Sequence, residues 1–167
     1  MTDQHTLLLM RHAKSDYPPG VADHDRPLAP RGIRQAGLAG DWLRAHAPTV
    51  DGVLCSTATR TRETLLRTRV DAPTRFSERI YAATPGAVID EINNTGDDVS
   101  TLLVIGHEPT MSTLALGLSG TADTNIAAAE RISVKFPTSA IAVLTVPCAW
   151  KQLELGAATL IGFEVPR

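Results

Sequence analysis

The sequence has few of the residues that mark several common classes of protein. Its 167 residues include only two cysteines, Cys55 and Cys148, and aromatic residues make up 4% of the chain. Two cysteines cannot form a disulfide framework or a CxxC metal site, so they favour a reducing compartment. Because aromatic rings are scarce, Val, Ile, Leu and Ala must supply most of the core packing.

Long apolar stretches and a strong net charge are also missing. The apolar run at Leu7–Met10 is far too short for a signal peptide or a membrane span, and no basic region precedes it. We therefore expect a cytoplasmic protein. The formal net charge of -2 argues against nucleic acid or an anionic membrane as the main partner, although arginines cluster between Arg60 and Arg79.

The length and composition predict one domain. The hydrophobic fraction of 43% and the charged fraction of 20% are ordinary for a soluble globular protein. A chain of 167 residues is long enough to bury a single core. No repeat, low-complexity tract or linker divides the sequence, so we predict a single domain over residues 1–167.

Apolar runs alternate with helical patterns, which is typical of an α/β fold. The expected strands are 6–10, 53–55, a short strand around Phe76, 102–105, 141–146 and 152–155. The expected helices are 32–45, one capped by Ser56 or Thr57, one capped by Thr84 that begins at Pro85, and one that begins at Pro109 and stops at Gly120. The proline-rich segment Ser15–Pro30 is expected to be a long loop, and long ordered loops are often functional.

Polar residues follow three of the expected strands at the point where each strand ends. Arg11 and His12 follow the first strand, the segment Ser56–Arg60 follows the second, and His107 follows the strand 102–105. The carboxyl ends of parallel strands share one edge of a sheet, where ligands bind in open α/β folds. We therefore expect two histidines and two arginines to converge there.

These residue types suit phosphoryl transfer. A neutral imidazole is a competent nucleophile, and arginine presents a planar fork of donors that matches phosphate oxygens. The reaction needs mainly positioning and stabilisation of negative charge, so no metal or other cofactor is expected. A lone histidine at a strand end is more often a structural residue, and Arg60 alone could be a solvated charge. The combination favours His12 as a nucleophile.

The motifs resemble those of the histidine phosphatase superfamily, also called the phosphoglycerate-mutase-like superfamily. The resemblance covers nearly the whole chain in the right order. It rests on Arg11–Ser15 (the RHG/RHA signature), Asp25–Ala36 (D-R-P-L-(S/T)-x-x-G-x-x-Q-A), Ser56–Thr64 (S-x-A-x-R-T-x-x-T) and Val104–Pro109 (the V-G-H-x-P junction). The tail Phe136–Ala140, followed by Trp150, resembles the small branch of SixA phosphohistidine phosphatases.

The resemblance implies a fold and a set of roles. The fold would be a three-layer α/β/α sandwich with a mostly parallel central sheet. His12 would be phosphorylated in the intermediate, while Arg11, Arg60 and His107 bind the phosphoryl oxygens. Ser15 matches a position near the phosphate in some members.

The proton donor is a separate question. Larger members of the superfamily use a glutamate, and the segment Glu78–Tyr81 resembles the one that carries it. Glu78 could equally be a surface charge paired with Arg75 or Arg79. Phosphohistidine phosphatases can lack such an acid, because an imidazole leaving group needs less protonation than an alkoxide.

The sequence leaves several substrates open. It has no large insertion over the site, which favours an open cleft and a protein phosphohistidine as substrate. The first alternative is a phosphatase of a small sugar, nucleotide or other phosphomonoester, and the chain is short for a mutase. A second alternative is a non-catalytic phosphate-sensing module. The segments Ser15–Pro30 and Thr121–Glu130 are expected to shape specificity.

Overall fold

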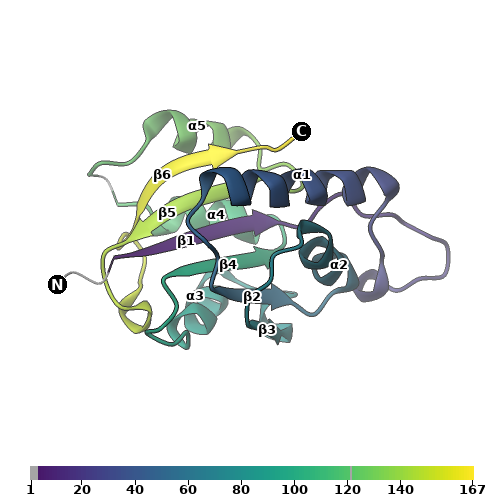
Figure 1. Cartoon of the computed structure of the whole chain (residues 1–167), viewed down its shortest axis with the longest axis horizontal. Helices are drawn as coiled ribbons and strands as arrows, with labels where there is room; N and C mark the ends of the chain where they lie inside the picture. Colours follow the sequence, from purple (N-terminus) through teal and green to yellow (C-terminus); the bar gives the residue numbers. More distant parts are fainter. Residues whose placement is uncertain (1–3, 121) are drawn as a thin grey trace.

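The computed structural model describes residues 4–120 and 122–167 (Figure 1), so Thr121, the first residue of the segment 121–130, lies outside the described residues. In these ranges the strands form one six-stranded sheet in the order β3-β2-β4-β1-β5-β6. Strands β3, β2, β4 and β1 are parallel, whereas β5 is antiparallel to both β1 and β6. The strands are β1 (His5–Arg11), β2 (Gly52–Ser56), β3 (Thr74–Ser77), β4 (Thr101–Gly106), β5 (Ile141–Val146) and β6 (Thr159–Glu164).

Helices cover both faces of the sheet. Helices α1 and α2 lie on one face, and α3, α4 and α5 lie on the other (Figure 1), which confirms the three-layer α/β/α sandwich with a mostly parallel sheet. The α-helices are α1 (Pro30–His46), α2 (Thr59–Thr68), α3 (Pro85–Asn93), α4 (Thr110–Leu118) and α5 (Ile126–Val134). Short 3-10 turns are η1 (Asp23–Asp25), η2 (Glu78–Ile80) and η3 (Trp150–Gln152). None of the helices in the described ranges combines the length and apolar character needed to cross a membrane.

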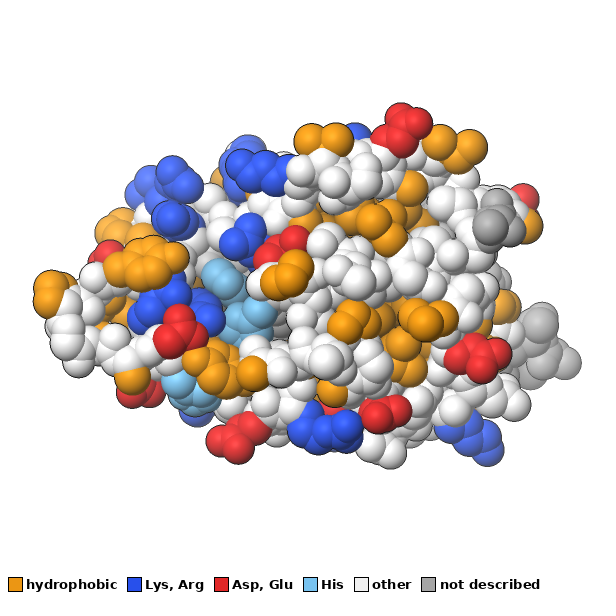
Figure 2. All heavy atoms as spheres, turned by 180° about the vertical axis from the view of Figure 1, so that it is seen from behind, with side chains coloured by type: hydrophobic (Ala, Val, Ile, Leu, Met, Phe, Trp, Pro, Cys, Tyr) orange, Lys and Arg blue, Asp and Glu red, His pale blue; other side chains and the backbone are white. Residues whose placement is uncertain are grey.

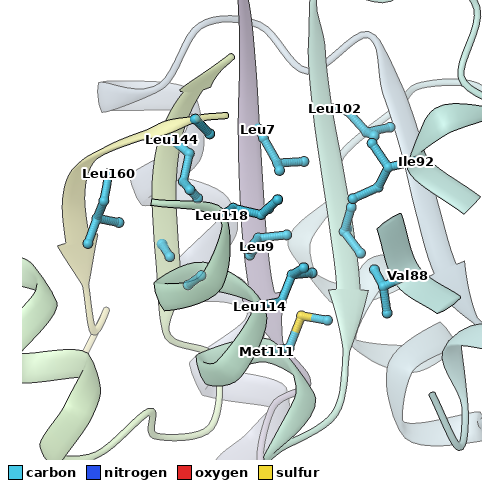
Figure 3. Close-up of a cluster of buried hydrophobic side chains, with 14 of the residues drawn as sticks. Leu7, Leu9, Val88, Ile92, Leu102, Met111, Leu114, Leu118, Leu144 and Leu160 are labelled. Carbon is cyan, nitrogen blue, oxygen red and sulfur yellow. The ribbon is translucent and has the colours of Figure 1, made fainter. Parts of the chain in front are cut away.

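The core has two halves, one on each face of the sheet. Successive residues of a strand point to opposite faces, so Leu7 and Leu9 of β1 face α4 while Leu8 and Met10 face α1 and α2. Figure 3 shows Leu7 and Leu9 among side chains from α3, α4, β4, β5 and β6. The central strand is therefore an uninterrupted apolar run because both of its faces are buried.

Helix caps agree with expectation at α3 and differ at α2. The Thr84 hydroxyl accepts a hydrogen bond from the amide of Ala87 (3.2 Å), as an N-cap does. At α2 the expected cap by Ser56 or Thr57 is wrong, because Ala58 takes the N-cap position without a side-chain bond. Ser56 ends β2 instead, and its hydroxyl contacts His107.

The strand expected at 152–155 is also wrong. A 3-10 turn occupies Trp150–Gln152, and the last strand of the sheet is β6. Trp150 is fully buried and its indole N–H donates to the carbonyl of Val99 (2.8 Å), so this segment is anchored by one large side chain rather than by strand pairing. The β5–β6 pairing shifts register between Val143 and Leu144, which interrupts the alternation that would have revealed β6.

Helix α5 was not expected from the sequence. Ala128 and Ile132 are its buried residues, while Ile126 and Val134 are 70% and 86% exposed. The apolar residues therefore do not form the wide stripe that usually identifies a surface helix. The helix begins at a recognisable cap, since the Asn125 side chain accepts from the amide of Ala128 (3.0 Å).

Candidate active site

The carboxyl ends of β1 and β4 bring the two histidines together. Arg11 pairs with Gly106 in the parallel ladder, and the amide of His12 donates to the carbonyl of Gly106 (3.0 Å). His12 and His107 are therefore the first residues beyond two adjacent strands. Their ring centroids lie 5.3 Å apart.

The backbone sets the tautomer of His12. Its Nδ1 lies 2.7 Å from the carbonyl oxygen of Ala13, and a carbonyl only accepts, so Nδ1 carries the proton. The lone pair is thereby left on Nε2. Ala13 is held in turn, since its amide donates to the hydroxyl of Thr64 (3.0 Å), which is fully buried in α2.

Burial keeps both imidazoles neutral near pH 7. Desolvation lowers the pKa of His12 to about 3, opposed by its bond to Ala13 and reinforced by His107, Arg60 and Arg11. Desolvation also lowers the pKa of His107 to about 4, with the charge of Arg60 as the next cause. His12 therefore holds its lone pair in the form that a nucleophile needs.

Two arginines border the histidines. Arg60, in the first turn of α2, donates from Nη1 to the carbonyl of Asp23 (2.8 Å) and from Nη2 to its carboxylate (3.2 Å). Arg11 donates from Nη1 to the carbonyl of Phe136 (2.9 Å) in the loop before β5. Figure 2 shows pale-blue histidine side chains in a hollow bordered by basic side chains, and His12 and His107 line the cleft together with Arg11 and Arg60.

Several nitrogens of this cluster have no partner. Arg11 Nε, Arg60 Nε and His107 Nδ1 are buried and form no hydrogen bond to any residue in the described ranges. Nε2 of His107 lies 2.8 Å from the hydroxyl of Ser56. Buried polar groups in native proteins nearly always have partners, so this convergence indicates a site for a group rich in acceptor oxygens.

These side chains line a cleft of about 170 Å³. A cleft of this size accommodates a phosphoryl group and the atoms bonded to it. Its lining consists of Arg11, His12, Lys14, Ser15, Tyr17, Arg26, Arg60, His107, Glu108 and Thr138.

The structure brings most of the predicted site residues together. Arg11, His12, Ser15, Arg60 and His107 all line the cleft. The Ser15 hydroxyl accepts a hydrogen bond from a further arginine of the lining.

Glu78 does not lie among the cleft-lining residues. It is exposed on η2, and the arginines considered as its partners pair elsewhere: Arg75 with Glu91, and Arg79 with Asp90 and Glu91. A catalytic role for Glu78 stays a prediction.

The lining contains a carboxylate that sequence reasoning missed. Glu108 follows His107, and its two carboxylate oxygens accept from the amide (2.7 Å) and the hydroxyl (2.8 Å) of Ser112. The sequence did hold one signal for Glu108: it directly follows the histidine of the V-G-H-x-P junction motif.

The loop 15–30 also contributes residues to the site. Arg26 lies in the cleft lining and its guanidinium stacks 3.6 Å above the ring of Tyr17. Asp23 contacts Arg60 from the same loop. Arg26 belongs to the motif Asp25–Ala36 that carries the family resemblance, whereas no local pattern in the sequence distinguished Asp23.

The described residues contain no cluster of three or more His, Cys, Asp or Glu side chains arranged to hold a metal ion. The positive charge at the cleft comes from three arginines, Arg11, Arg26 and Arg60, and from Lys14. Arginine stays protonated at any relevant pH and offers several N–H donors in one plane. The arrangement is therefore chemically suited to bind a phosphoryl group beside an uncharged imidazole nucleophile.

Comparison with known proteins identifies the family. The model of the histidine phosphatase superfamily (branch 1) matches residues 7–95, a segment that includes Arg11, His12 and Arg60. The chain belongs to the histidine phosphatase superfamily. Its fold and family together make it a phosphatase.

Relatives of this histidine phosphatase align over almost its full length. The uncharacterised protein Rv1276c of Mycobacterium tuberculosis is 66% identical over 158 residues, which are 95% of this chain and 100% of that one. A candidate phosphohistidine phosphatase SixA from Nakamurella multipartitia superposes with a TM-score of 0.90 at 38% identity, covering 98% of this chain and 96% of that one. A candidate SixA from Agrobacterium tumefaciens superposes with a TM-score of 0.78 at 26% identity, covering 97% and 99%.

Proposed function

We propose that this histidine phosphatase uses Nε2 of His12 as its nucleophile. Nε2 attacks phosphorus in line, so the Nε2–P bond forms as the bond to the leaving group breaks. Water then hydrolyses the phosphohistidine and releases inorganic phosphate. The single observation that carries this proposal is the 2.7 Å bond from Nδ1 of His12 to the carbonyl of Ala13, which leaves the lone pair on Nε2.

Arg11, Arg60 and His107 bind the phosphoryl oxygens in this proposal. Their buried, unpartnered nitrogens support it, because preorganised donors stabilise the charge of the transition state without reorganising. Arginine supplies the positive charge that a metal would otherwise provide, so the reaction is proposed to need no metal. Ser15 lines the same cleft and would contact the phosphoryl group.

The proposed substrate is a phosphohistidine in a protein. Support comes from the two SixA-like structures, which are at least 26% identical to this chain. An imidazole leaving group needs little protonation, which suits a cleft that does not include Glu78. The cytoplasm is the proposed location, and the two free cysteines fit its reducing conditions.

Replacing His12 tests the nucleophile. In H12A, turnover of p-nitrophenyl phosphate and of a phosphohistidine peptide is expected to fall by roughly a thousandfold or more. Rapid acid-free quenching of the wild type should trap an acid-labile phosphoenzyme that H12A lacks. The matched control is H46A, which removes an exposed histidine of α1 and should keep full activity. Full turnover in H12A would refute the proposal, and binding of phosphoprotein without a phosphoenzyme would favour a phosphate-sensing module.

A second candidate function is hydrolysis of a small phosphomonoester. It is favoured by Glu108, the carboxyl group in the cleft lining, because an alkoxide leaving group needs a proton donor. The two functions are separated by comparing kcat/KM for a phosphohistidine peptide with kcat/KM for sugar and nucleotide phosphates. A larger value for one of the phosphomonoesters would favour the second candidate.

A further inference from the structure

One carboxylate of the loop 15–30 engages a catalytic arginine from outside the cleft lining. Asp23 lies in the turn η1, 37 residues before Arg60 in the chain. Its backbone carbonyl accepts from Arg60 Nη1 (2.8 Å) and its carboxylate from Arg60 Nη2 (3.2 Å). We propose that Asp23 is a positioning residue that presents Arg60 to the phosphoryl group. The inference rests on the proposed function, in which Arg60 binds phosphoryl oxygens.

The contact decides which donors of Arg60 remain for a ligand. A guanidinium has five N–H bonds, and Asp23 uses one on each terminal nitrogen. The remaining donors include Nε, which is buried and has no partner in the described ranges. Nε and a terminal N–H form the side-on fork that matches two oxygens of a phosphoryl group. Asp23 thereby fixes the plane of the guanidinium and leaves this pair of donors available to a phosphoryl group.

Asp23 is itself held in place. Its carboxylate accepts from the hydroxyl of Tyr81 (2.5 Å) and from Nη1 of Arg26 (2.9 Å). These bonds, with the charge of Arg60, hold the pKa of Asp23 well below its usual range, so the group stays ionised at neutral pH. Arg26 also donates to the Ser15 hydroxyl in the cleft, so the same carboxylate organises two cleft-lining arginines.

The two effects of Asp23 on phosphate binding have opposite signs. As a negative charge near an anion site, Asp23 disfavours an incoming phosphate, so its removal would strengthen binding on Coulombic grounds alone. As a positioning residue, Asp23 keeps Arg60 in one orientation, so its removal leaves the guanidinium free to rotate and weakens binding. The sign of the change therefore separates positioning from simple repulsion.

The experiment compares D23A and D23N with a matched control on the same turn. Asp25 is an exposed acid whose carboxylate lies 3.7 Å from Nδ1 of the His24 ring, and no ion pair joins it to Arg60 in the described ranges, so D25A removes equal charge without touching Arg60. Titration calorimetry with inorganic phosphate is expected to show roughly tenfold weaker binding in D23A, less in D23N, and a change within about twofold in D25A. KM for p-nitrophenyl phosphate should rise in the same order. Tighter or unchanged phosphate binding in both Asp23 variants would overturn the inference.

A double mutant tests whether Asp23 acts through Arg60. D23A is expected to cost much less phosphate affinity in an R60A background than in the wild type, because the guanidinium that Asp23 positions is gone, whereas its charge and its contact with Arg26 act in both backgrounds. Additive losses would overturn the inference. Thermal melts of each variant report folding, and D23N keeps an acceptor oxygen at the same place if D23A is unstable. An active H12A would refute the proposed function instead, and the calorimetric comparison would still decide the role of Asp23.

Discussion

At the residue scale, the reactivity of His12 is set by two neighbours that contribute only backbone and hydroxyl groups. The carbonyl of Ala13 places the proton on Nδ1, and Thr64 holds the amide of Ala13 from α2. Burial then keeps the ring neutral. The nucleophile therefore depends on the packing of α2 against the turn after β1 as much as on its own side chain.

Burial of the two histidines predicts a loss of stability in acid. Their folded pKa values of about 3 and about 4 lie below the unfolded value of 6.5, so below pH 6.5 the unfolded chain binds protons that the native state does not. The free energy of unfolding should fall as the pH drops from 6.5 toward 4, by up to about 1.4 kcal/mol per pH unit for each histidine. Urea unfolding at a series of pH values measures this slope.

The variants H12N and H107N provide the controls for that series. Each removes one titrating group, so the slope between pH 6.5 and 4 should decrease in each variant. The unusually low pKa of Asp23 contributes only at more acidic pH, below the ordinary range of a carboxyl. A wild-type stability that stays constant from pH 6.5 to 4.5 would contradict the prediction.

At the scale of elements, the site depends on how closely α1 and α2 approach. A Cβ atom at Gly40 of α1 would lie 2.1 Å from the backbone carbonyl oxygen of Thr68 at the end of α2. No side chain fits there without moving a helix backbone. Arg60 lies in the first turn of α2. The packing of α1 against α2 therefore also affects the position of Arg60 in the cleft.

Two glycines of α1 should respond oppositely to alanine. G40A is expected to destabilise the protein by roughly 1–3 kcal/mol, because the overpacking outweighs the gain in helix propensity of about 1 kcal/mol. A Cβ atom at Gly37 would meet no neighbouring atom within 4 Å, so G37A should stabilise the protein by up to about 1 kcal/mol. Urea unfolding of both variants gives the comparison. Equal changes in the two would contradict the close approach of α1 and α2.

At the scale of the whole molecule, the cleft joins segments that are distant in the chain. Its lining comes from the ends of β1 and β4, from α2, from the loop 15–30 and from the loop before β5. A ligand that contacts all of them binds only the folded chain. Binding is therefore coupled to the stability of the entire sheet edge.

This coupling predicts a thermal shift with phosphate. At a concentration one hundred times its Kd, inorganic phosphate should stabilise the fold by about 2.7 kcal/mol, which raises Tm by several degrees. R60A is the control, and its shift at the same phosphate concentration should be much smaller. Differential scanning calorimetry measures both. An equal shift in the wild type and R60A would place the phosphate outside this cleft.

Sequence reasoning predicted most of the sheet and the residues at its carboxyl edge because both leave local signals. A strand buried on both faces, such as β1, is a continuous apolar run, and Thr84 caps α3 within a few residues. Because parallel strands end at one edge of the sheet, His12 and His107 are expected at that same edge. These features follow from short-range pattern and a general rule of topology.

Only the tertiary structure decided the arrangement within the cleft. The bond by which Thr64 holds the amide of Ala13, the contact of Asp23 with Arg60 and the place of Glu108 in the cleft lining depend on how separate elements pack. Partners 37 residues apart, such as Asp23 and Arg60, share no periodicity that a sequence could display. Their contact forms because the fold places the loop 15–30 beside the first turn of α2. There the oxygens of Asp23 accept hydrogen bonds from the buried guanidinium of Arg60.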